Sequence, residues 1–190
     1  MEAYNDDESH ASAVHFSNHT HSHIHYHYSV TVTAASAALI NKPTFRVYTK
    51  ANPGFCLTIR DGNLVVAKSD PNNKDQYWYR VDDYNSLVKD KDGSPAFSLV
   101  NKVTGLAIKH STGVNHPVRL VPYRPLSLDQ SILWTESMRC FDGFKAFRLV
   151  NNTNINLDIF GHGKVEDGTA IIMSRWKDCD RQKWAFCAAE

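Results

Sequence analysis

The sequence predicts an all-β fold that is built from three copies of one unit of about 50 residues. Each copy opens on an alternating strand led by Phe45, Phe97 or Phe147, which lie 52 and 50 residues apart. A second short strand keeps nearly the same spacing, at residues 57–59, 106–108 and 157–159. Short alternating segments separated by Asp-Gly turns are typical of antiparallel β structure. Four such strands in each of three copies, about 12 in all, predict a β-trefoil.

Each copy closes on a tryptophan that follows a glutamine. The pairs are Gln76 with Trp78, Gln130 with Trp134 in a stretched version, and Gln182 with Trp184. Tryptophan rings also bind sugars and bases, but a ring that recurs at one place in all three copies favours packing in a common core. We therefore expect the three rings in the core and the glutamine side chains bonded to the backbone of the turns.

Composition divides the chain into two segments, residues 1–42 and 43–190. The first segment has too few bulky apolar residues to offset the entropy of ordering, so we expect a disordered tail before the folded domain. Alternating histidines in this tail have a spacing that suits a transition metal: His19, His21, His23, His25 and His27. A flexible tract lacks the fixed geometry of a structural metal site. We favour a solvated tail and expect no bound metal or cofactor.

Charge and hydropathy narrow the classes of partner. The 21 Lys and Arg residues against 20 Asp and Glu give a formal net charge of +1, which favours neither nucleic acid nor a charged membrane surface. The sequence has no run of about 18 apolar residues, and its acidic N-terminus differs from a secretory signal. The four cysteines are sparse and irregular, so we expect a soluble intracellular protein with free thiols.

Several runs of residues resemble the Euonymus lectin family, a plant branch related to the ricin-B-type β-trefoil lectins. The longest is DQSILWTES at 129–137, and the others lie at 57–62, 95–102, 104–105, 109–111, 116–118, 148–152 and 167–169. The resemblance implies binding of galactosyl- or mannosyl-containing glycans through one sugar site, without catalysis, and glycans or glycoproteins as partners. It also implies residence in the cytoplasm and nucleus and a role in plant stress responses.

The three copies differ at one position that bears on binding. A polar residue present in a single copy is a better candidate for binding than a shared one, which holds the fold. We align the middle of the second strand as Thr58, Ala107 and Asp158, so the third copy alone supplies a carboxylate. In the ricin-B-type lectins that the sequence resembles, an aspartate here accepts hydrogen bonds from two neighbouring sugar hydroxyls.

A sugar site also needs a flat apolar ring on which the C–H face of the sugar packs. Trp176, six residues before Gln182, supplies one, and we align its counterparts as Asp70 and Tyr123. We predict Asp158 as hydroxyl acceptor, Trp176 as stacking ring and Gln182 as outer polar contact. The alternative is a surface acid at Asp158 and a core residue at Trp176.

Two departures from the family pattern bear on sugar preference. Arg181 stands where members of the family commonly carry asparagine, and the loop at residues 160–166 is shorter than theirs. Arg181 either reaches an acidic glycan or pairs with Asp178 or Asp180. His162, in the shortened loop, is a candidate for the rim of the site.

Two other classes of function compete with sugar binding. An enzyme needs a nucleophile with a base, a carboxylate pair or a metal set, and the best candidates are His110 with His116, or Asp158 with Glu166. We expect the two histidines to bond turn backbone, and we expect no catalysis. The other rival is a protein-interaction β-trefoil with a lost or altered sugar site. A single monosaccharide site is weak, so homo-oligomerisation would add useful avidity.

Overall fold

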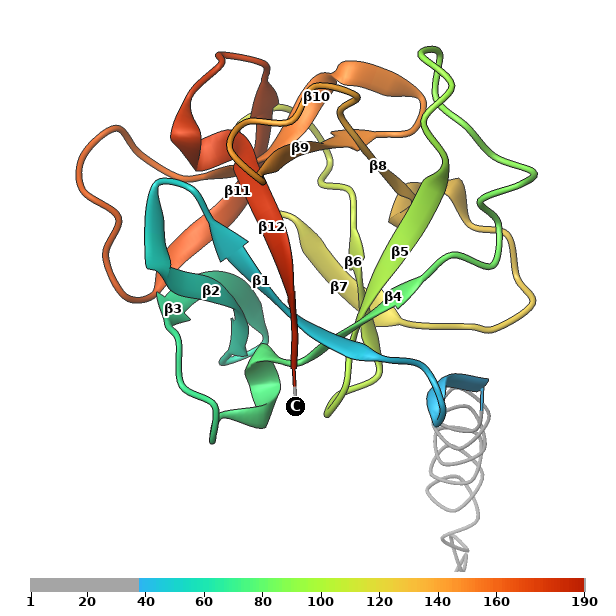
Figure 1. Cartoon of the computed structure of the whole chain (residues 1–190), viewed down its shortest axis with the longest axis horizontal. Helices are drawn as coiled ribbons and strands as arrows, with labels where there is room; N and C mark the ends of the chain where they lie inside the picture. Colours follow the sequence, from blue (N-terminus) through green and yellow to red (C-terminus); the bar gives the residue numbers. More distant parts are fainter. Residues whose placement is uncertain (1–37, 190) are drawn as a thin grey trace, which may run out of the picture.

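The computed structural model describes residues 38–189, which form 12 strands in three units of four (Figure 1). The first unit consists of β1 (Thr44–Thr49), β2 (Asn52–Arg60), β3 (Asn63–Lys68), the 3-10 helix η1 (Lys74–Gln76) and β4 (Trp78–Val81). The second consists of β5 (Ala96–Asn101), β6 (Leu106–Lys109), β7 (Arg119–Pro122), η2 (Gln130–Ile132) and β8 (Trp134–Glu136). The third consists of β9 (Lys145–Leu149), β10 (Asn152–Ile159), β11 (Thr169–Arg175), η3 (Asp180–Gln182) and β12 (Lys183–Ala188). The expected β-trefoil is confirmed.

The first and last strands of the units close into a barrel. Antiparallel pairing runs from β1 to β4, β5, β8, β9 and β12 and returns to β1. The middle strands form three hairpins, β2–β3, β6–β7 and β10–β11. The first hairpin turns at Asp61 and Gly62, whose φ angles of 51° and 74° suit the tight turn that Asp-Gly favours. A closed ring leaves its strands without free edges.

The three closing tryptophans form the repeated centre of the core, as expected. Trp78, Trp134 and Trp184 are fully buried. Each indole N–H donates a hydrogen bond to a carbonyl of its own hairpin, that of Leu57 at 3.1 Å, Ile108 at 3.0 Å and Leu157 at 3.1 Å. A buried indole N–H needs a partner, so these bonds fix each hairpin to the barrel.

The register of the repeats differs from the sequence alignment by two residues in two places. The indole bonds make Ile108, not Leu106, the counterpart of Leu57 and Leu157. In β9, Lys145 lies opposite the closing tryptophan, where β1 and β5 place their leading phenylalanines. Side chains of a strand alternate with a period of two residues, so a shift by two keeps the same faces buried and leaves the apolar pattern unchanged.

The second copy also departs from the expected Gln-x-Trp motif. Helix η2 ends at Ile132, two residues before Trp134, which is the place that Gln76 and Gln182 hold in η1 and η3. The prediction that Gln130 is the stretched counterpart of these glutamines is therefore wrong. An apolar side chain packs at this position instead of bonding the turn.

The described part of the chain begins before the boundary expected at residue 43. Leu39 is buried in a cluster with Val81, Val100, Ala107, Tyr123 and Ile132. The folded part therefore includes residues that the sequence assigned to the tail. The five tail histidines and their metal hypothesis lie outside the described residues. Residues 38–189 contain no helix with the length and apolar character needed to span a bilayer.

Candidate functional site

Asp158 is a buried carboxylate on the third hairpin. It lies in β10 between Leu157 and Ile159, which both pack in the main core, so its own side chain points to the other face of the strand. It is 3 % exposed. A polar group this deeply buried requires hydrogen-bond partners.

Two donors hold one oxygen of Asp158. The hydroxyl of Ser174 donates to Oδ2, and Nε2 of Gln182 approaches the same oxygen at 3.1 Å. The Gln182 amide also contacts the Ser174 hydroxyl at 2.8 Å. These contacts leave Oδ1, which is buried and has no hydrogen-bond partner within residues 38–189. The carboxylate therefore keeps one acceptor free.

Gln182 serves the turn as well as the carboxylate. Its Nε2 donates to the Arg175 carbonyl at 2.8 Å, and its Oε1 accepts from the Lys177 amide at 2.8 Å. Gln76 makes the same two bonds in the first unit, to the Lys68 carbonyl and from the Asp70 amide, both at 2.8 Å. The glutamines therefore bond turn backbone, as expected, and the third unit adds the contact to Asp158.

Asp158 lines a surface depression of about 370 Å³. The polar side chains that line it besides Asp158 are His162, Lys177, Asp180 and Arg181, and the remaining lining residues are Ala51, Gly161 and Cys179. His162 is exposed in the loop that follows β10. The depression thus combines a buried carboxylate with cationic, imidazole and carboxylate groups at its rim.

Arg181 shapes the loop of this depression. Its Nη1 donates to the carbonyls of Ile159 at 3.2 Å and Phe160 at 2.9 Å, and its Nη2 donates to that of Gly163. One of the two alternatives for Arg181, a pairing with Asp178 or Asp180, is not observed, because both carboxylates instead lie within ion-pair distance of Lys183, at 3.1 and 3.3 Å. Arg181 therefore positions the segment that carries His162.

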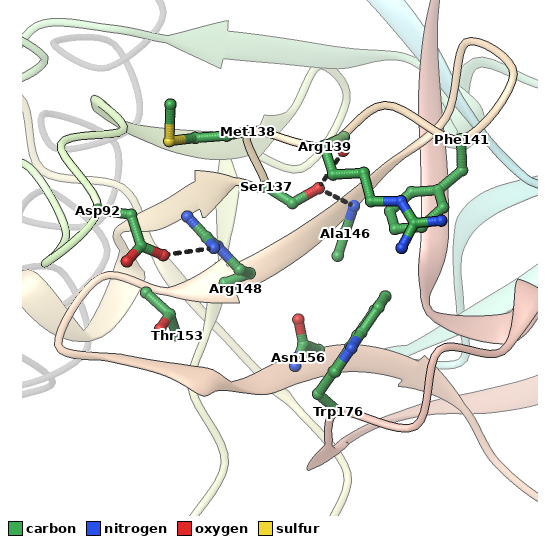
Figure 2. A pocket seen from close by; sticks show the side chains of 10 residues that line it. All are labelled: Asp92, Ser137, Met138, Arg139, Phe141, Ala146, Arg148, Thr153, Asn156 and Trp176. Carbon is green, nitrogen blue, oxygen red and sulfur yellow. Dashed lines mark hydrogen bonds and ion pairs between the residues drawn. The ribbon is translucent and has the colours of Figure 1, made fainter.

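Trp176 does not line the Asp158 depression. It lines a separate hollow of about 250 Å³, the Trp176 hollow, together with Phe141 and Asn156 (Figure 2). The Phe141 and Trp176 rings are 5.9 Å apart between centroids and tilted by 42°. The structure thus brings Asp158 and Gln182 together and places the predicted stacking ring on the other side of the segment that begins at Lys177.

The observed register also changes the counterparts of the site residues. Counted from the indole bonds, Asp158 corresponds to Thr58 and Lys109, not Ala107. The amide of Trp176 bonds the Asn154 carbonyl as Ser69 bonds Gly54 and Tyr123 bonds Gly105, so Ser69 replaces Asp70 as its counterpart in the first unit. The third unit remains the one with a carboxylate.

Two polar residues at this hairpin were missed by the sequence reasoning, Ser174 and Asn156. Their counterparts in the first hairpin are Ala67 and Cys56, as the pairing of β2 with β3 and β10 with β11 shows. A polar residue at a position that is otherwise apolar was the available signal.

The histidines proposed as a catalytic pair have different environments. Nε2 of His110 lies 3.0 Å from the Leu133 carbonyl, and the ring packs edge-on against Trp134 at 4.8 Å between centroids. Burial lowers the pKa of His110 to about 4. His116 is exposed, and Glu166, the partner suggested for Asp158, is exposed too. The structural interpretation of His110 is confirmed.

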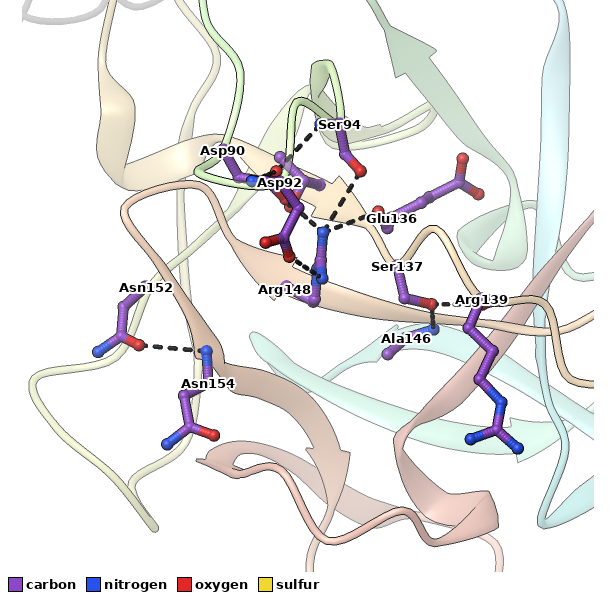
Figure 3. Close-up of polar contacts among 11 residues, drawn as sticks. Asp90, Asp92, Ser94, Glu136, Ser137, Arg139, Ala146, Arg148, Asn152 and Asn154 are labelled. Atoms are coloured by element: carbon purple, nitrogen blue, oxygen red, sulfur yellow. Dashed lines mark hydrogen bonds and ion pairs between the residues drawn. The ribbon is translucent and has the colours of Figure 1, made fainter.

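Figure 3 shows a cluster of ion pairs around Arg148. Two of its members, Arg148 and Asp92, line the Trp176 hollow. Arg148 in β9 pairs with Asp90 and Asp92 of the β4–β5 connection. Asp90 also accepts hydrogen bonds from the Thr135 hydroxyl at 2.6 Å and the Ser94 amide at 3.0 Å. The cluster joins the second and third units and fixes one wall of the Trp176 hollow.

Cysteine and metal chemistry take no part in the arrangement of residues 38–189. All four cysteines are free thiols in this structure. Burial raises the pKa of the Cys56 thiol to about 11, which keeps it protonated and unreactive at neutral pH. No group of three or more His, Cys, Asp or Glu side chains in this part of the chain is placed to hold a metal ion.

Three hairpin units around a tryptophan core define a β-trefoil, and its third hairpin carries a buried carboxylate that lines a surface depression. The chain is 47% identical over 152 residues to Ricin B-like lectin EULS3 of Arabidopsis thaliana, covering 78% of this chain and 48% of that protein. It is also 47% identical over 147 residues to Ricin B-like lectin R40G3 of Oryza sativa subsp. japonica, covering 75% and 72%. The chain therefore belongs to the ricin B-like lectin family, in its Euonymus lectin branch.

The comparisons with known proteins also support the fold. The designed three-fold symmetric protein ThreeFoil superposes with a TM-score of 0.61 at 18% identity, covering 75% of this chain and 96% of that chain. No protein-family model matches the chain. The chain spans about half the length of EULS3 and 72% of R40G3. Both relatives are named lectins, in agreement with the expected absence of catalysis.

Proposed function

We propose that this chain binds glycans at the Asp158 depression of its third unit. The observation that carries the proposal is a buried carboxylate in the lining of this depression: Oδ1 of Asp158 has no partner within the described residues, whereas Oδ2 is held by Ser174 and Gln182. An acceptor fixed in one orientation suits neighbouring hydroxyls of a sugar ring, which each donate a hydrogen bond. Family membership supports galactosyl- or mannosyl-containing glycans as the ligands.

The rim residues complete the proposed sugar contact. Trp176 lies outside this depression, so the exposed imidazole of His162 is the remaining ring against which a sugar packs. Three bonds from Arg181 to loop carbonyls hold this loop in place. At roughly 0.3 kcal/mol for each of about twelve heavy atoms, a monosaccharide gains about 4 kcal/mol, which corresponds to a Kd near 1 mM. Avidity therefore needs longer glycans, glycoproteins with several chains, or a homo-oligomer.

Replacing the carboxylate tests this site. We expect Asp158→Asn to weaken glycan binding by about 10- to 100-fold, because a hydrogen bond to a charged acceptor contributes about 1.5–3 kcal/mol. The measurement is a glycan array with the full chain, followed by titration calorimetry on the strongest hits. Asp61→Asn is the matched control, since it removes an exposed carboxylate from the first hairpin and asparagine tolerates its φ of 51°. Equal binding by both variants would contradict the proposed site.

The alternative function is a protein-interaction β-trefoil with a lost or altered sugar site. The position of Trp176 outside the Asp158 depression is the observation that favours it. A folded chain that binds no glycan on the array would support this alternative. Residence in the cytoplasm and nucleus and a role in stress responses are further proposals, and they rest on membership of the Euonymus lectin branch.

A further inference from the structure

The hollow beside Trp176 is separate from the Asp158 depression. It is formed by β9, β10, the β4–β5 and β8–β9 connections and the residue that follows β11 (Figure 2). Trp176 lines this hollow while the next residue, Lys177, lines the other one. Ligand pockets usually measure about 300–1,000 Å³. A hollow of about 250 Å³ is therefore sized for one small ring.

Asn156 gives this hollow a buried and unpaired polar group. It is 0 % exposed, and neither Oδ1 nor Nδ2 has a hydrogen-bond partner within residues 38–189. Its counterparts in the other hairpins are Cys56 and Ala107, which are both buried, so the fold accepts a small apolar side chain here. A buried amide without a partner is unfavourable. The third unit thus carries a polar group that its scaffold does not need.

Trp176 supplies a ring surface next to this amide. The other three tryptophans of the chain are fully buried in the core, and Trp176 is partly exposed. Cationic groups of Lys183 and Arg139 lie over the Phe141 ring at 4.4 and 4.6 Å, so Phe141 is already covered by these groups. Figure 2 shows the Asn156 amide and the Trp176 indole next to each other, with Arg148 on the opposite wall.

The charged side chains that line the hollow are paired with opposite charges, so the hollow presents little net charge to a ligand. The guanidinium of Arg148 is paired with Asp90 and Asp92, and the exposed Arg139 lies within 3.9 Å of Asp178. An uncharged amide that offers an NH₂ donor group and an acceptor oxygen matches two neighbouring hydroxyls, which each donate and accept. An indole face matches the C–H face of a sugar.

We propose that the Trp176 hollow is a second carbohydrate site, which takes one neutral pyranose ring. The sugar packs on the Trp176 indole, and two adjacent hydroxyls bond the Asn156 amide. The proposal relies on the lectin function above for the class of ligand, and it does not depend on Asp158. A chain with two sites in one unit would bind branched or clustered glycans more tightly than either site alone.

The indole N–H resonances of the full chain test this site by NMR. The four tryptophans give four indole signals, and Trp176→Phe identifies that of Trp176 by its loss. The probes are galactose, mannose, glucose, N-acetylglucosamine and N-acetylgalactosamine, each titrated to about 100 mM because single sugars bind near millimolar. We expect at least one of them to shift the Trp176 signal saturably. The proposal is overturned if none does.

Two variants separate this site from the one at Asp158. Asn156→Ala introduces the alanine that the second hairpin has at this position, so the variant should unfold at the same or a higher urea concentration than the wild type. The affinity of the sugar, measured from the titration of the Trp176 signal, should fall at least tenfold. Asp158→Asn should leave the Trp176 shift intact, even if the Asp158 proposal itself fails. An undiminished shift in Asn156→Ala, or loss of the shift in Asp158→Asn, would show that no independent second site exists.

Discussion

Replacing Asp90 by alanine is expected to lower the free energy of unfolding by about 3 kcal/mol. Removing one partner of a buried ion pair typically costs about 3–5 kcal/mol, because the other charge is left without compensation. The side chain of Asp90 is fully buried and that of Arg148 is 11 % exposed. Asp92 still pairs with Arg148 at 2.9 Å, which places the loss at the lower end of that range. Urea unfolding at pH 7 measures it.

The control for this prediction is Asp92→Ala. The Asp92 side chain is 38 % exposed, and exposed ion pairs contribute about 1 kcal/mol or less. The double variant Asp90→Ala with Arg148→Met should lose less stability than the two single variants combined, because it removes the unpaired charge. If Asp90→Ala lost no more than Asp92→Ala, the buried pair would not stabilise the contact between the second and third units.

The pKa of Asp90 determines the pH below which this cluster stops stabilising the fold. Burial alone would raise the pKa of Asp90, but hydrogen bonds from Thr135 and the Ser94 amide and the charge of Arg148 hold it below its ordinary value. A carboxylate with a lowered pKa stabilises the fold at neutral pH and loses that contribution as the pH falls through the lowered value. Arg148, the ion-pair partner of Asp90, also lines the Trp176 hollow.

The three-unit fold could be predicted because its signals repeat. Three closing tryptophans and three pairs of short alternating strands indicate a threefold core without any knowledge of distant contacts. The register of the second hairpin could not be predicted in the same way. Leu106 and Ile108 both suit the buried face, and the acceptor of the Trp134 indole decides between them. That acceptor lies 26 residues away in the sequence, where no local pattern identifies it.

The candidate site was predictable in part. A difference between the repeats at one strand position singles out Asp158, and the sequence predicts Gln182 in the same site. The hydrogen bond between the two side chains was not predicted. The side on which Trp176 lies depends on how the chain turns after β11, where Asp178 adopts a positive φ of 50°. Spacing along the sequence does not specify that turn. The pair of Asp90 and Arg148, 58 residues apart and in different units, had no local signal either.

Lowering the pH from 7 to 4 is expected to destabilise the domain by about 3 kcal/mol through His110 alone. Burial lowers the pKa of His110 from 6.5 to about 4, and the nearby Lys109 and Arg119 act in the same direction. The Leu133 carbonyl and Asp129 oppose the shift without cancelling it. As the pH falls, His110 is therefore protonated near pH 6.5 in the unfolded chain but only near pH 4 in the folded chain. Stability is complete above pH 6.5 and falls through this window, by about 1.4 kcal/mol per pH unit at most.

Urea unfolding at pH 7, 5.5 and 4.5 measures this dependence, and His110→Gln isolates it. Glutamine does not titrate and retains an N–H donor for the Leu133 carbonyl, so the variant should lose most of the slope between pH 6.5 and 4.5. His116→Gln, which removes an exposed histidine from the same connection, should keep it. The folded-state pKa of His110 can also be measured directly, by an NMR titration of its imidazole in the wild type. A value near 6.5, or an unchanged slope of stability against pH in His110→Gln, would contradict the prediction. The window lies above the range in which the lowered pKa of Asp90 acts, so the two effects are separable on one pH series.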